Sequence, residues 1–341
     1  MKQSMRQMLS AYSNFFKQNR GFPKFKSKKD KQSALFPYEA ISKRNTFDER
    51  KITLTQDLKD IRFRCSDLYF KRLQNHKGCI KSATVSKTKS GNYFLSILID
   101  IQKEELVKFS HTNQSVGIDL GVKDFVITSD GEVFENKHFF KKQERKVKKL
   151  QRQLSRKVKG SNNRNKQRIR LARAFERLTD QKEAYIHYVV NCLLSDYDLV
   201  CMEDLNVNGM LKNHKLAKAI QEVGLYRFRQ ILTDKAALNG KQVVYVDRFY
   251  PSSKTCNKCG YIKRDLTLSD REWFCPICGE HHDRDVNAAM NILGEGIKII
   301  GSRTAEFTLV ENPTVDGRLA TDLKSGGSLK QEGKTNNSSF Y

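Results

Sequence analysis

Three short acidic motifs are the parts of this chain whose residue types and spacing could do chemistry: GIDLG at 117–121, MEDL at 202–205 and DRDVNAA at 283–289. Each of the first two places a carboxylate at the end of an apolar, strand-like run, and the third begins a helix-like segment shortly after a Cys-x-x-Cys pair. Carboxylates that converge from distant parts of a chain hold divalent metal ions for phosphodiester chemistry. The candidate ligands are Asp119, Glu203 and Asp285. Taken one at a time, each is also an ordinary cap or turn residue.

The composition indicates a folded protein with a polyanionic partner. Hydrophobic residues make up 38% of the 341 residues, which is enough to bury a core and excludes a wholly disordered chain. Lysine and arginine number 63 against 38 acids, giving a net charge of +25, and this excess favours nucleic acid or an anionic membrane as partner. The chain has no run of about eighteen apolar residues and no signal peptide, so the membrane alternative is weak.

Two segments concentrate the positive charge. In the first, GFPKFKSKKDKQ at 21–32, lysines alternate with two phenylalanines, so rings could stack on bases while ammonium groups hold phosphates; a solvated loop is the alternative. The second, 141–182, holds 17 Lys or Arg against 3 acids, whereas a solvated helix normally mixes both signs. We therefore predict nucleic-acid contacts by these side chains: Lys24, Lys26, Lys28, Lys29, Lys148, Lys149, Arg152, Arg168 and Arg170.

Four of the eight cysteines are grouped in two Cys-x-x-Cys knuckles, CNKCG and CPICG, separated by fifteen residues: Cys256, Cys259, Cys275 and Cys278. A two-residue spacer lets both sulfurs of a knuckle reach one ion, and four sulfurs about 2.3 Å from it form a closed tetrahedral zinc site. A redox role is the alternative. Because four sulfurs leave no open coordination position, the predicted zinc is structural. The adjacent His281 and His282 are expected at the surface or beside the site rather than as ligands.

The apolar patterns predict a β-rich segment followed by alternating strands and helices. Residues 1–18 carry a helical stripe, and 33–110 alternates apolar and polar residues as in a small barrel or curled sheet. The later elements are expected as two strands with turns over 116–134, a helical hairpin over 137–195 broken at 160–165, a strand at 198–205, an amphipathic helix at 216–240, a strand at 241–250, a helix from about 284 to 294 and a disordered tail after 300.

The three acids and this order of elements fit a ribonuclease-H-type fold. In that fold the first strand ends in an Asp, a later neighbouring strand ends in an acid, and a C-terminal helix packed on the sheet supplies the third. All three can then face one edge of the sheet, where carboxylates bridge two ions about 3.5–4 Å apart.

Six strings of this sequence resemble those of the TnpB family, the OrfB proteins of small bacterial insertion sequences, which are kin to the RuvC-like nucleases of type V CRISPR effectors. They follow the family's order over about 20–330: GFPKFKSKK, GIDLGVKDF, VCMEDLNV, VDRFYPSSKTCNKCG, WFCPICGEHHDRDVNAAMNI and SGGSLKQEG. The resemblance implies an RNA-guided, metal-dependent DNA endonuclease. Its partners would be DNA and a guide RNA, with no membrane, in the bacterial cytoplasm at the nucleoid.

The same resemblance assigns roles to residues. Asp119, Glu203 and Asp285 match the catalytic triad that holds two Mg²⁺ ions, and Asp285 is preferred to Asp283 because the family's acid directly precedes x-N-A-A. The four grouped cysteines match the family's structural zinc site. Family members usually open with a β-strand and a helical recognition bundle before the GFPKFKSKK string, which here begins at 21, so an N-terminally truncated member is expected.

The expected fold class is α/β: a ribonuclease-H-like (RuvC) nuclease domain with an inserted four-cysteine zinc ribbon, preceded by a β-rich, wedge-like partial barrel. The expected division is a basic helical remnant of the recognition region at 1–32, the wedge-like domain at 33–112, the nuclease domain at 113–255 and 282–300, the zinc ribbon at 256–281 and the tail at 301–341. Two other functions stay open, namely a nuclease-silent nucleic-acid-binding remnant and a transposase that joins DNA strands.

Overall fold

A computed structural model describes residues 2–310, with gaps at 19–20, 26, 28–31, 42–48, 77–78, 103–106 and 268. Three predicted nucleic-acid contacts (Lys26, Lys28 and Lys29) and the predicted tail beyond 310 lie outside the described residues. The described elements form a β-rich N-terminal part and a mixed α/β part, which are taken in turn below.

In the described residues, the N-terminal part begins with the helix that the sequence predicts and continues with five short strands and two further helices. Three strands form an antiparallel sheet in the order β1-β4-β5, and β2 pairs with β3. A buried cluster that includes Ile52, Leu54 and Ile80 forms its core. The elements are α1 (Lys2–Gln18), β1 (Gln32–Pro37), α2 (Tyr38–Ile41), β2 (Lys51–Ile52), β3 (Ile61–Arg62), α3 (Asp67–Asn75), β4 (Ile80–Lys87) and β5 (Tyr93–Ile99).

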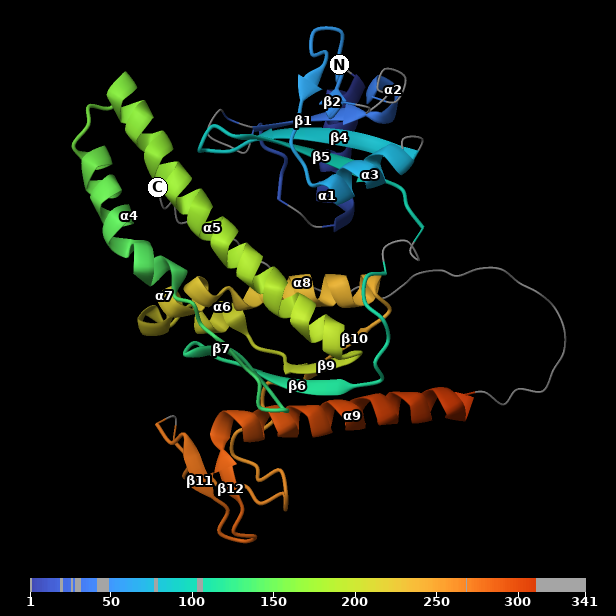
Figure 1. The fold of residues 1–341 in the computed structure, drawn as a ribbon, viewed down its shortest axis with the longest axis vertical. Coiled ribbons are helices and arrows are strands. Elements are labelled where there is room, and N and C mark those ends of the chain that lie inside the picture. Colours follow the sequence, from blue (N-terminus) through green and yellow to red (C-terminus); the bar gives the residue numbers. More distant parts are fainter. Residues whose placement is uncertain are drawn as a thin grey trace, which may run out of the picture. The chain divides into compact units, whose positions relative to one another are not determined.

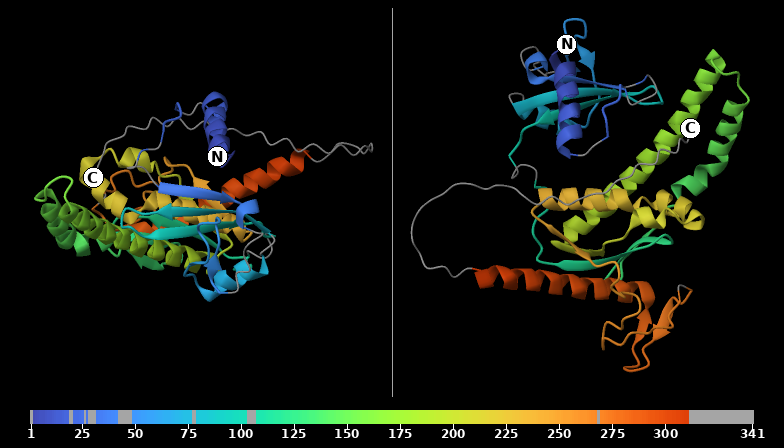
Figure 2. Two further views of the ribbon diagram at one scale, coloured as in Figure 1. Left: turned by 90° about the horizontal axis from the view of Figure 1, so that it is seen from above. Right: turned by 180° about the vertical axis from the view of Figure 1, so that it is seen from behind.

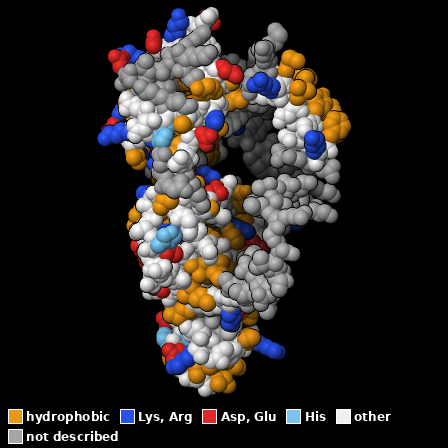
Figure 3. Space-filling model, turned by 90° about the vertical axis from the view of Figure 1, so that its right-hand side faces the viewer, with side chains coloured by type: hydrophobic (Ala, Val, Ile, Leu, Met, Phe, Trp, Pro, Cys, Tyr) orange, Lys and Arg blue, Asp and Glu red, His pale blue; other side chains and the backbone are white. Residues whose placement is uncertain are grey.

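Helix α1 leaves part of its apolar stripe in contact with solvent, since Met8, Leu9 and Phe16 are exposed. Figure 3 draws one face of the molecule, on which hydrophobic side chains gather in separate groups with charged residues between them. Among the described residues, no helix has the length and apolar character needed to traverse a bilayer.

A five-stranded mixed sheet is the centre of the second part, with the strand order β10-β9-β6-β7-β8. Strands β10, β9 and β6 are parallel, whereas β7 and β8 pair antiparallel. Parallel strands bring their carboxyl ends to one edge of a sheet, which is where open α/β sheets build their sites. The strands are β6 (Ser115–Leu120), β7 (Asp124–Thr128), β8 (Val133–Glu135), β9 (Leu199–Glu203) and β10 (Gln242–Val246).

Helices cover both faces of this sheet. In Figure 1, α5 and α8 lie on one face and α9 on the other, and the view from behind in Figure 2 shows the same layers. The core joins β6 residues such as Ile118 to Leu193 of α5 and Phe228 of α8, each of which is completely buried. Burial of one such side chain stabilises the fold by about 1.5–3 kcal/mol. The helices are α4 (Phe139–Ser155), α5 (Asn162–Asp196), α6 (Val207–Met210), α7 (His214–Val223), α8 (Leu225–Leu238) and α9 (Arg284–Val310).

The predicted helical hairpin is confirmed by α4 and α5, but the break between them spans 156–161 rather than 160–165, because α5 already begins at Asn162. Ser161 caps α5 by accepting a hydrogen bond from the amide of Arg164 at 3.1 Å. The guanidinium of Arg164 donates to the carbonyl oxygens of Leu154 (3.0 Å) and Lys157 (2.9 Å), at the end of α4. These bonds satisfy carbonyls that a helix end leaves without partners, so they fix the turn of the hairpin.

Two predicted boundaries are wrong. The single helix expected at 216–240 is two helices, because Gly224 takes a φ of 78° between α7 and α8, and this left-handed conformation ends a helix. The helix expected to stop near 294 continues to Val310, so the tail predicted from 301 begins as helix. The sequence suggested a helix end because glycine often follows the last residue of a helix. In α9, however, Gly296 lies within the helix, where the absence of a side chain allows close packing on the sheet.

Candidate metal centres at the sheet edge and in the cysteine ribbon

Strand pairing places the first two acids side by side. In the parallel register of β6 and β9, Gly117 lies opposite Cys201, so two residues further along Asp119 comes beside Glu203. Successive side chains of a strand point to opposite faces, so Asp119 shares a face with Gly117 and Glu203 shares a face with Cys201. Both acids therefore face the side on which α9 packs.

Two glycines let α9 approach this face closely. A Cβ atom on Gly117 of β6 would lie 2.0 Å from the carbonyl oxygen of Ala289 in α9. A Cβ atom on Gly296 of α9 would lie 2.3 Å from the sulfur of Cys201 in β9. Both distances are impossible for real atoms, so a side chain at either position would push the helix off the sheet. The first glycine of GIDLG, Gly117, thus sets the spacing between the strand that carries Asp119 and the helix that carries Asp285.

Replacing Gly296 with alanine is expected to lower the free energy of unfolding by about 1–3 kcal/mol, the usual cost of overpacking a core. The matched control is Gly294→Ala, in the same helix, where a Cβ atom would meet nothing within 4 Å. There the better helix propensity of alanine should give a gain of about 1 kcal/mol or less. Chemical denaturation of both variants measures the difference. Equal stability of the two would contradict the close helix–sheet contact.

The start of α9 assigns different tasks to the two acids of the third motif. The carboxylate of Asp283 accepts hydrogen bonds from the amides of Asp285 (2.9 Å) and Val286 (3.0 Å), which is the geometry of a helix N-cap. Asp285 lies in the first turn, and its charge acts on the carboxyl of Asp119. Asp283 is therefore a cap, whereas Asp285 is the acid of this motif whose charge acts on Asp119, and its role as a metal ligand stays a prediction.

Electrostatics at this edge favour binding of a cation. Burial, followed by the charges of Glu203 and Asp285, raises the pKa of Asp119 to about 7. Burial also raises the pKa of Glu203, although a hydrogen bond from Ser252 opposes it. Carboxylates that repel one another and hold protons near neutral pH are stabilised when a metal ion replaces the proton. The donor set of three carboxylates suits a hard cation such as Mg²⁺.

A chain of hydrogen bonds connects α9 to the second acid. Asn291 of α9 donates to the carbonyl oxygens of Ser252 (2.8 Å) and Thr255 (2.6 Å), in the connection that follows β10. The hydroxyl of Ser252 donates to the carboxylate of Glu203. Asn291, the second asparagine of the DRDVNAAMN string, thus orients Glu203 through Ser252. No spacing signal in the sequence pairs these residues.

The neighbouring acid of the MEDL motif has a structural task. Asp204 forms ion pairs with Arg229 of α8 (2.5 Å) and with Arg248 after β10 (2.7 Å). Burial opposes its charge, but the hydrogen bonds from both arginines lower its pKa. Asp204 therefore anchors the end of β9. Glu203 belongs instead to the acidic edge, the end of the sheet where the charges of Asp119, Glu203 and Asp285 interact.

Two arginines hold the carboxylate of Asp285. Arg284 approaches one carboxylate oxygen to 2.8 Å, and Arg271, just before strand β11 (Glu272–Phe274), approaches the other to 2.8 Å. Within the described ranges, the grouped cysteines alone meet the close spacing of a ready metal cluster, and the three acids do not. A metal ion at the acidic edge must therefore compete with these guanidinium groups for Asp285. No pattern in the sequence signals this competition, because Arg271 lies 14 residues from its partner.

The four grouped cysteines form a metal-binding cluster, as predicted. Their ligand atoms all lie within 4.8 Å of one another. After each knuckle the glycine takes a positive φ, 77° at Gly260 and 70° at Gly279, so that the backbone can fold back over the sulfurs. Although burial opposes the change, the amides of Cys278 and Ile277 lower the pKa of Cys275 to about 6. At Cys259 and Cys278 a backbone hydrogen bond opposes the change, but burial and neighbouring thiols raise the pKa. A thiolate is the form that binds a metal, so a bound ion would have to displace the protons of the other thiols.

The cysteine ribbon has very little core besides the cluster. Strands β11 (Glu272–Phe274) and β12 (His281–Asp283) pair antiparallel, and Trp273 packs with Leu266 against the sulfurs. The imidazole of His282 is buried, with its Nε2 atom 3.0 Å from the sulfur of Cys256, while His281 is more exposed. This agrees with the expectation that the histidines lie beside the site.

The predicted nucleic-acid contacts that the structure describes are all exposed. Lys24 lies in the segment after α1, and Lys149, Arg152, Arg168 and Arg170 lie on α4 and α5. Lys148 is also exposed but forms an ion pair with Glu144 at 3.0 Å, which partly neutralises it. These residues are therefore accessible to a ligand, and their binding role stays a prediction.

Two family models match parts of this chain, and known proteins are similar to most of it. A family model described as "Probable transposase" (OrfB_IS605) matches residues 96–214, and one described as "Cas12f1-like, TNB domain" matches residues 226–292. The "Putative RNA-guided DNA endonuclease" of Streptomyces pristinaespiralis is 36% identical over 298 residues, which cover 87% of this chain and 71% of that protein. The "Putative RNA-guided DNA endonuclease InsQ" of Escherichia coli K12 is 30% identical over 319 residues, covering 88% and 75%.

A solved structure shares the fold. The cryo-EM structure of a Cas12f1–sgRNA–target DNA complex contains a chain that matches with a TM-score of 0.51 at 16% identity, covering 84% of this chain and 69% of that one. Because the identity is low, this match concerns the fold alone. The two sequence relatives at 36% and 30% identity, which align over more than two thirds of their length, confirm the resemblance drawn from the motifs. The chain belongs to the TnpB (OrfB) family of RNA-guided DNA endonucleases.

Proposed function

We propose that this protein cuts DNA as an RNA-guided, metal-dependent endonuclease, and that its mixed α/β part is a RuvC-like nuclease domain of the ribonuclease-H type. One observation supports the proposal: the β6–β9 register sets Asp119 beside Glu203, and the charges of Glu203 and Asp285 add to burial in raising the pKa of Asp119. The names of the two relatives support guided DNA cleavage as the activity. The basic surface supports nucleic acid as the substrate.

In this proposal, Asp119, Glu203 and Asp285 hold two Mg²⁺ ions, and the four grouped cysteines hold a structural zinc ion. When bound by these acids, magnesium would supply an activated water for attack on the phosphorus and would stabilise charge on the leaving 3′ oxygen. Asp119, whose pKa is raised to about 7, would lose its proton when metal ions bind. The hydrogen bond from the hydroxyl of Ser252 would hold the carboxylate of Glu203 in place. The guanidinium groups of Arg271 and Arg284 lie beside Asp285, where they can receive the charge of a substrate phosphate.

The remaining parts would hold the nucleic acids. We assign guide binding to the β-rich wedge-like segment 33–112, nuclease function to 113–255 and to the segment from 282, and stabilisation of the third acid to the ribbon 256–281. The expected end of this segment was residue 300, whereas its helix α9 continues to Val310. The exposed cations Lys24, Lys149 and Arg152 would contact phosphates of the guide or target.

Cleavage of DNA by the purified protein with its guide RNA is the direct test. We expect Mg²⁺-dependent cutting of matched DNA that stops with EDTA and with a guide of unrelated sequence. Guide binding without any cutting would instead support the nuclease-silent alternative. Joining of transposon-end DNA to a second duplex would support strand transfer.

A further inference from the structure

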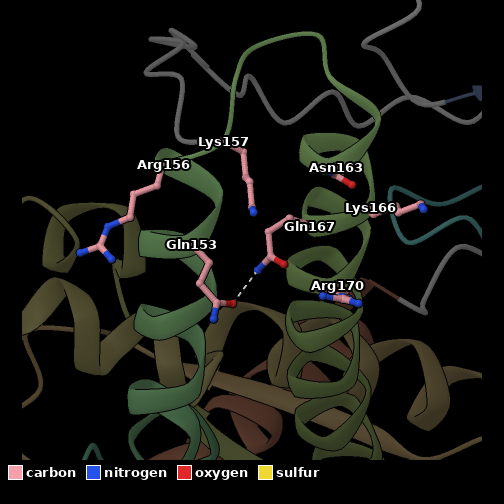
Figure 4. Close-up of a pocket in the computed structure, with 7 residues that line it drawn as sticks. All are labelled: Gln153, Arg156, Lys157, Asn163, Lys166, Gln167 and Arg170. Atoms are coloured by element: carbon pink, nitrogen blue, oxygen red, sulfur yellow. Dashed lines mark hydrogen bonds between the residues drawn. The ribbon is translucent and has the colours of Figure 1, made fainter.

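The closed end of the α4–α5 hairpin contains a basic cavity that is separate from the acidic edge. Its volume is about 410 Å³, and four cations and three amides line it: Arg156, Lys157, Lys166, Arg170, Gln153, Asn163 and Gln167. Figure 4 shows Lys157 pointing between the two helices toward Gln167, with Arg156 and Lys166 pointing outward on either side. In Figure 1 this end of the hairpin projects away from the sheet.

The positive charge of the cavity is not balanced by its surroundings. Residues 145–175 contain 13 Lys or Arg and no Asp or Glu. Nearer the sheet the same hairpin is mixed, since Glu144 pairs with Lys148 and Lys218, and Glu183 pairs with Arg227. The hairpin therefore keeps its counter-charges at one end and leaves the cations at the other end for an external anion.

The cavity is also held in shape before any ligand binds. Gln167 is almost completely buried, and its side-chain amide donates to Gln153 at 3.0 Å and to the carbonyl of Leu150 at 3.3 Å, so it ties α5 to α4. Arg164 fixes the turn through the carbonyls of Leu154 and Lys157. A site whose walls are already ordered loses less conformational entropy on binding than a flexible basic loop.

We propose that this cavity binds the backbone of an RNA strand, with the cations on its phosphates and the exposed amides of Gln153 and Asn163 on ribose hydroxyls. An amide side chain offers both a donor and an acceptor, and the 2′-hydroxyl, which is also both, is the group that distinguishes RNA from DNA. A cavity of a few hundred Å³ is large enough to enclose a sugar-phosphate unit. The proposal rests on the proposed function, because it names a place where that function's RNA partner is held.

Two double variants test the proposal. Lys157→Gln with Arg170→Gln removes one cavity cation from each side of the hairpin. The control, Lys146→Gln with Arg177→Gln, removes one exposed cation from each helix outside the cavity, so the change in net charge is the same. The probes are a fluorescein-labelled single-stranded RNA and the DNA of the same sequence, and fluorescence anisotropy measures affinity over a range of salt concentrations.

The cavity variant should weaken RNA binding about tenfold or more, and the dependence of log affinity on log salt should fall by roughly 1–2, as expected for lost phosphate contacts. The control should change much less. The cavity variant should also lose more affinity for RNA than for DNA. Equal losses in the two variants, or a loss confined to DNA, would overturn the proposal.

The assay separates this inference from the proposed function because it requires no cleavage. If the wild type cuts guided DNA while the cavity variant binds RNA normally, the inference fails and the function stands. If the wild type fails to cut guided DNA, but the cavity variant has the expected lower affinity for RNA, the inference stands and the catalytic proposal fails. If the wild type has no measurable affinity for the RNA, both fail.

Discussion

The Asp119→Asn variant is expected to lose Mg²⁺-dependent cleavage of guide-matched DNA by a factor on the order of 10³ or more. A metal ion that neutralises transition-state charge contributes several kcal/mol, and each 1.4 kcal/mol corresponds to about tenfold in rate. Asp119 is central to the cluster, since both other acids act on its pKa. Asparagine keeps its size but offers no negative charge to the ions. Single-turnover cleavage of labelled DNA measures the loss.

The same variant should be at least as stable as the wild type without metal, which excludes unfolding as the cause. In the folded protein the pKa of Asp119 is raised from 3.8 to about 7, so the neutral form is preferred. The wild type therefore loses stability as pH rises from about 4 to about 7, by up to a few kcal/mol, and Asp119→Asn does not. Urea unfolding at pH 5 and pH 8 should show the variant's advantage at pH 8. A large loss of stability at pH 8 would contradict the electrostatic account.

A matched pair in the third motif provides the control for position. Asp285→Asn should abolish cleavage as Asp119→Asn does, because Asp285 belongs to the acidic edge. Asp283→Asn should keep near-normal cleavage, because its carboxylate caps α9 and asparagine is an equally good N-cap. If Asp283→Asn removed cleavage while Asp285→Asn retained it, the assignment of the two acids would be reversed.

Removal of the ribbon's metal is expected to unfold residues 256–281 and to end cleavage. Structural zinc contributes about 10–16 kcal/mol of binding free energy in small domains, and the core of this ribbon is built around its own ligands. Its loss would also withdraw Arg271 from Asp285 and Asp283 from the start of α9. Both consequences weaken the placement of the third acid.

Trp273 reports the state of the ribbon because it is the chain's single tryptophan and is buried against the cysteine sulfurs. A chelator, or Cys275→Ser, should shift its fluorescence to longer wavelength, and zinc should reverse the effect of the chelator. Cys79→Ser is the control, since Cys79 is exposed and outside the cluster. Elemental analysis checks that the metal has been removed. If the fluorescence spectrum and the cleavage rate are unchanged in that metal-free protein, the metal has no structural role.

The sequence predicted those parts of the fold that depend on local patterns. Apolar runs located the strands that carry Asp119 and Glu203, and the polar break located the hairpin to within a few residues. A single helix is expected at 216–240 because an isolated glycine inside an apolar stripe is usually tolerated. Only the conformation of Gly224, with its φ of 78°, separates α7 from α8.

The supporting residues of the candidate site could not be predicted, because their roles depend on tertiary contacts. Ser252 reaches Glu203 across 49 residues, and Arg271 reaches Asp285 only because the ribbon folds back on itself. The four cysteines, in contrast, could be predicted as one metal site, because the spacing of the two Cys-x-x-Cys knuckles is itself visible in the sequence. Gly117 could be recognised as part of the GIDLG motif from the sequence. That a glycine is needed there because α9 packs closely against it could be learned only from the structure.

The central claim is that the carboxylates of Asp119, Glu203 and Asp285 jointly bind divalent metal ions. Crystals grown with Mn²⁺ and measured at the manganese absorption edge test it most directly. The claim predicts two anomalous peaks about 3.5–4 Å apart, each in contact with the acidic edge, with Asp285 turned from its arginines to the metal. Manganese absent from that edge, with Arg271 and Arg284 still paired to Asp285 at a saturating metal concentration, would contradict it.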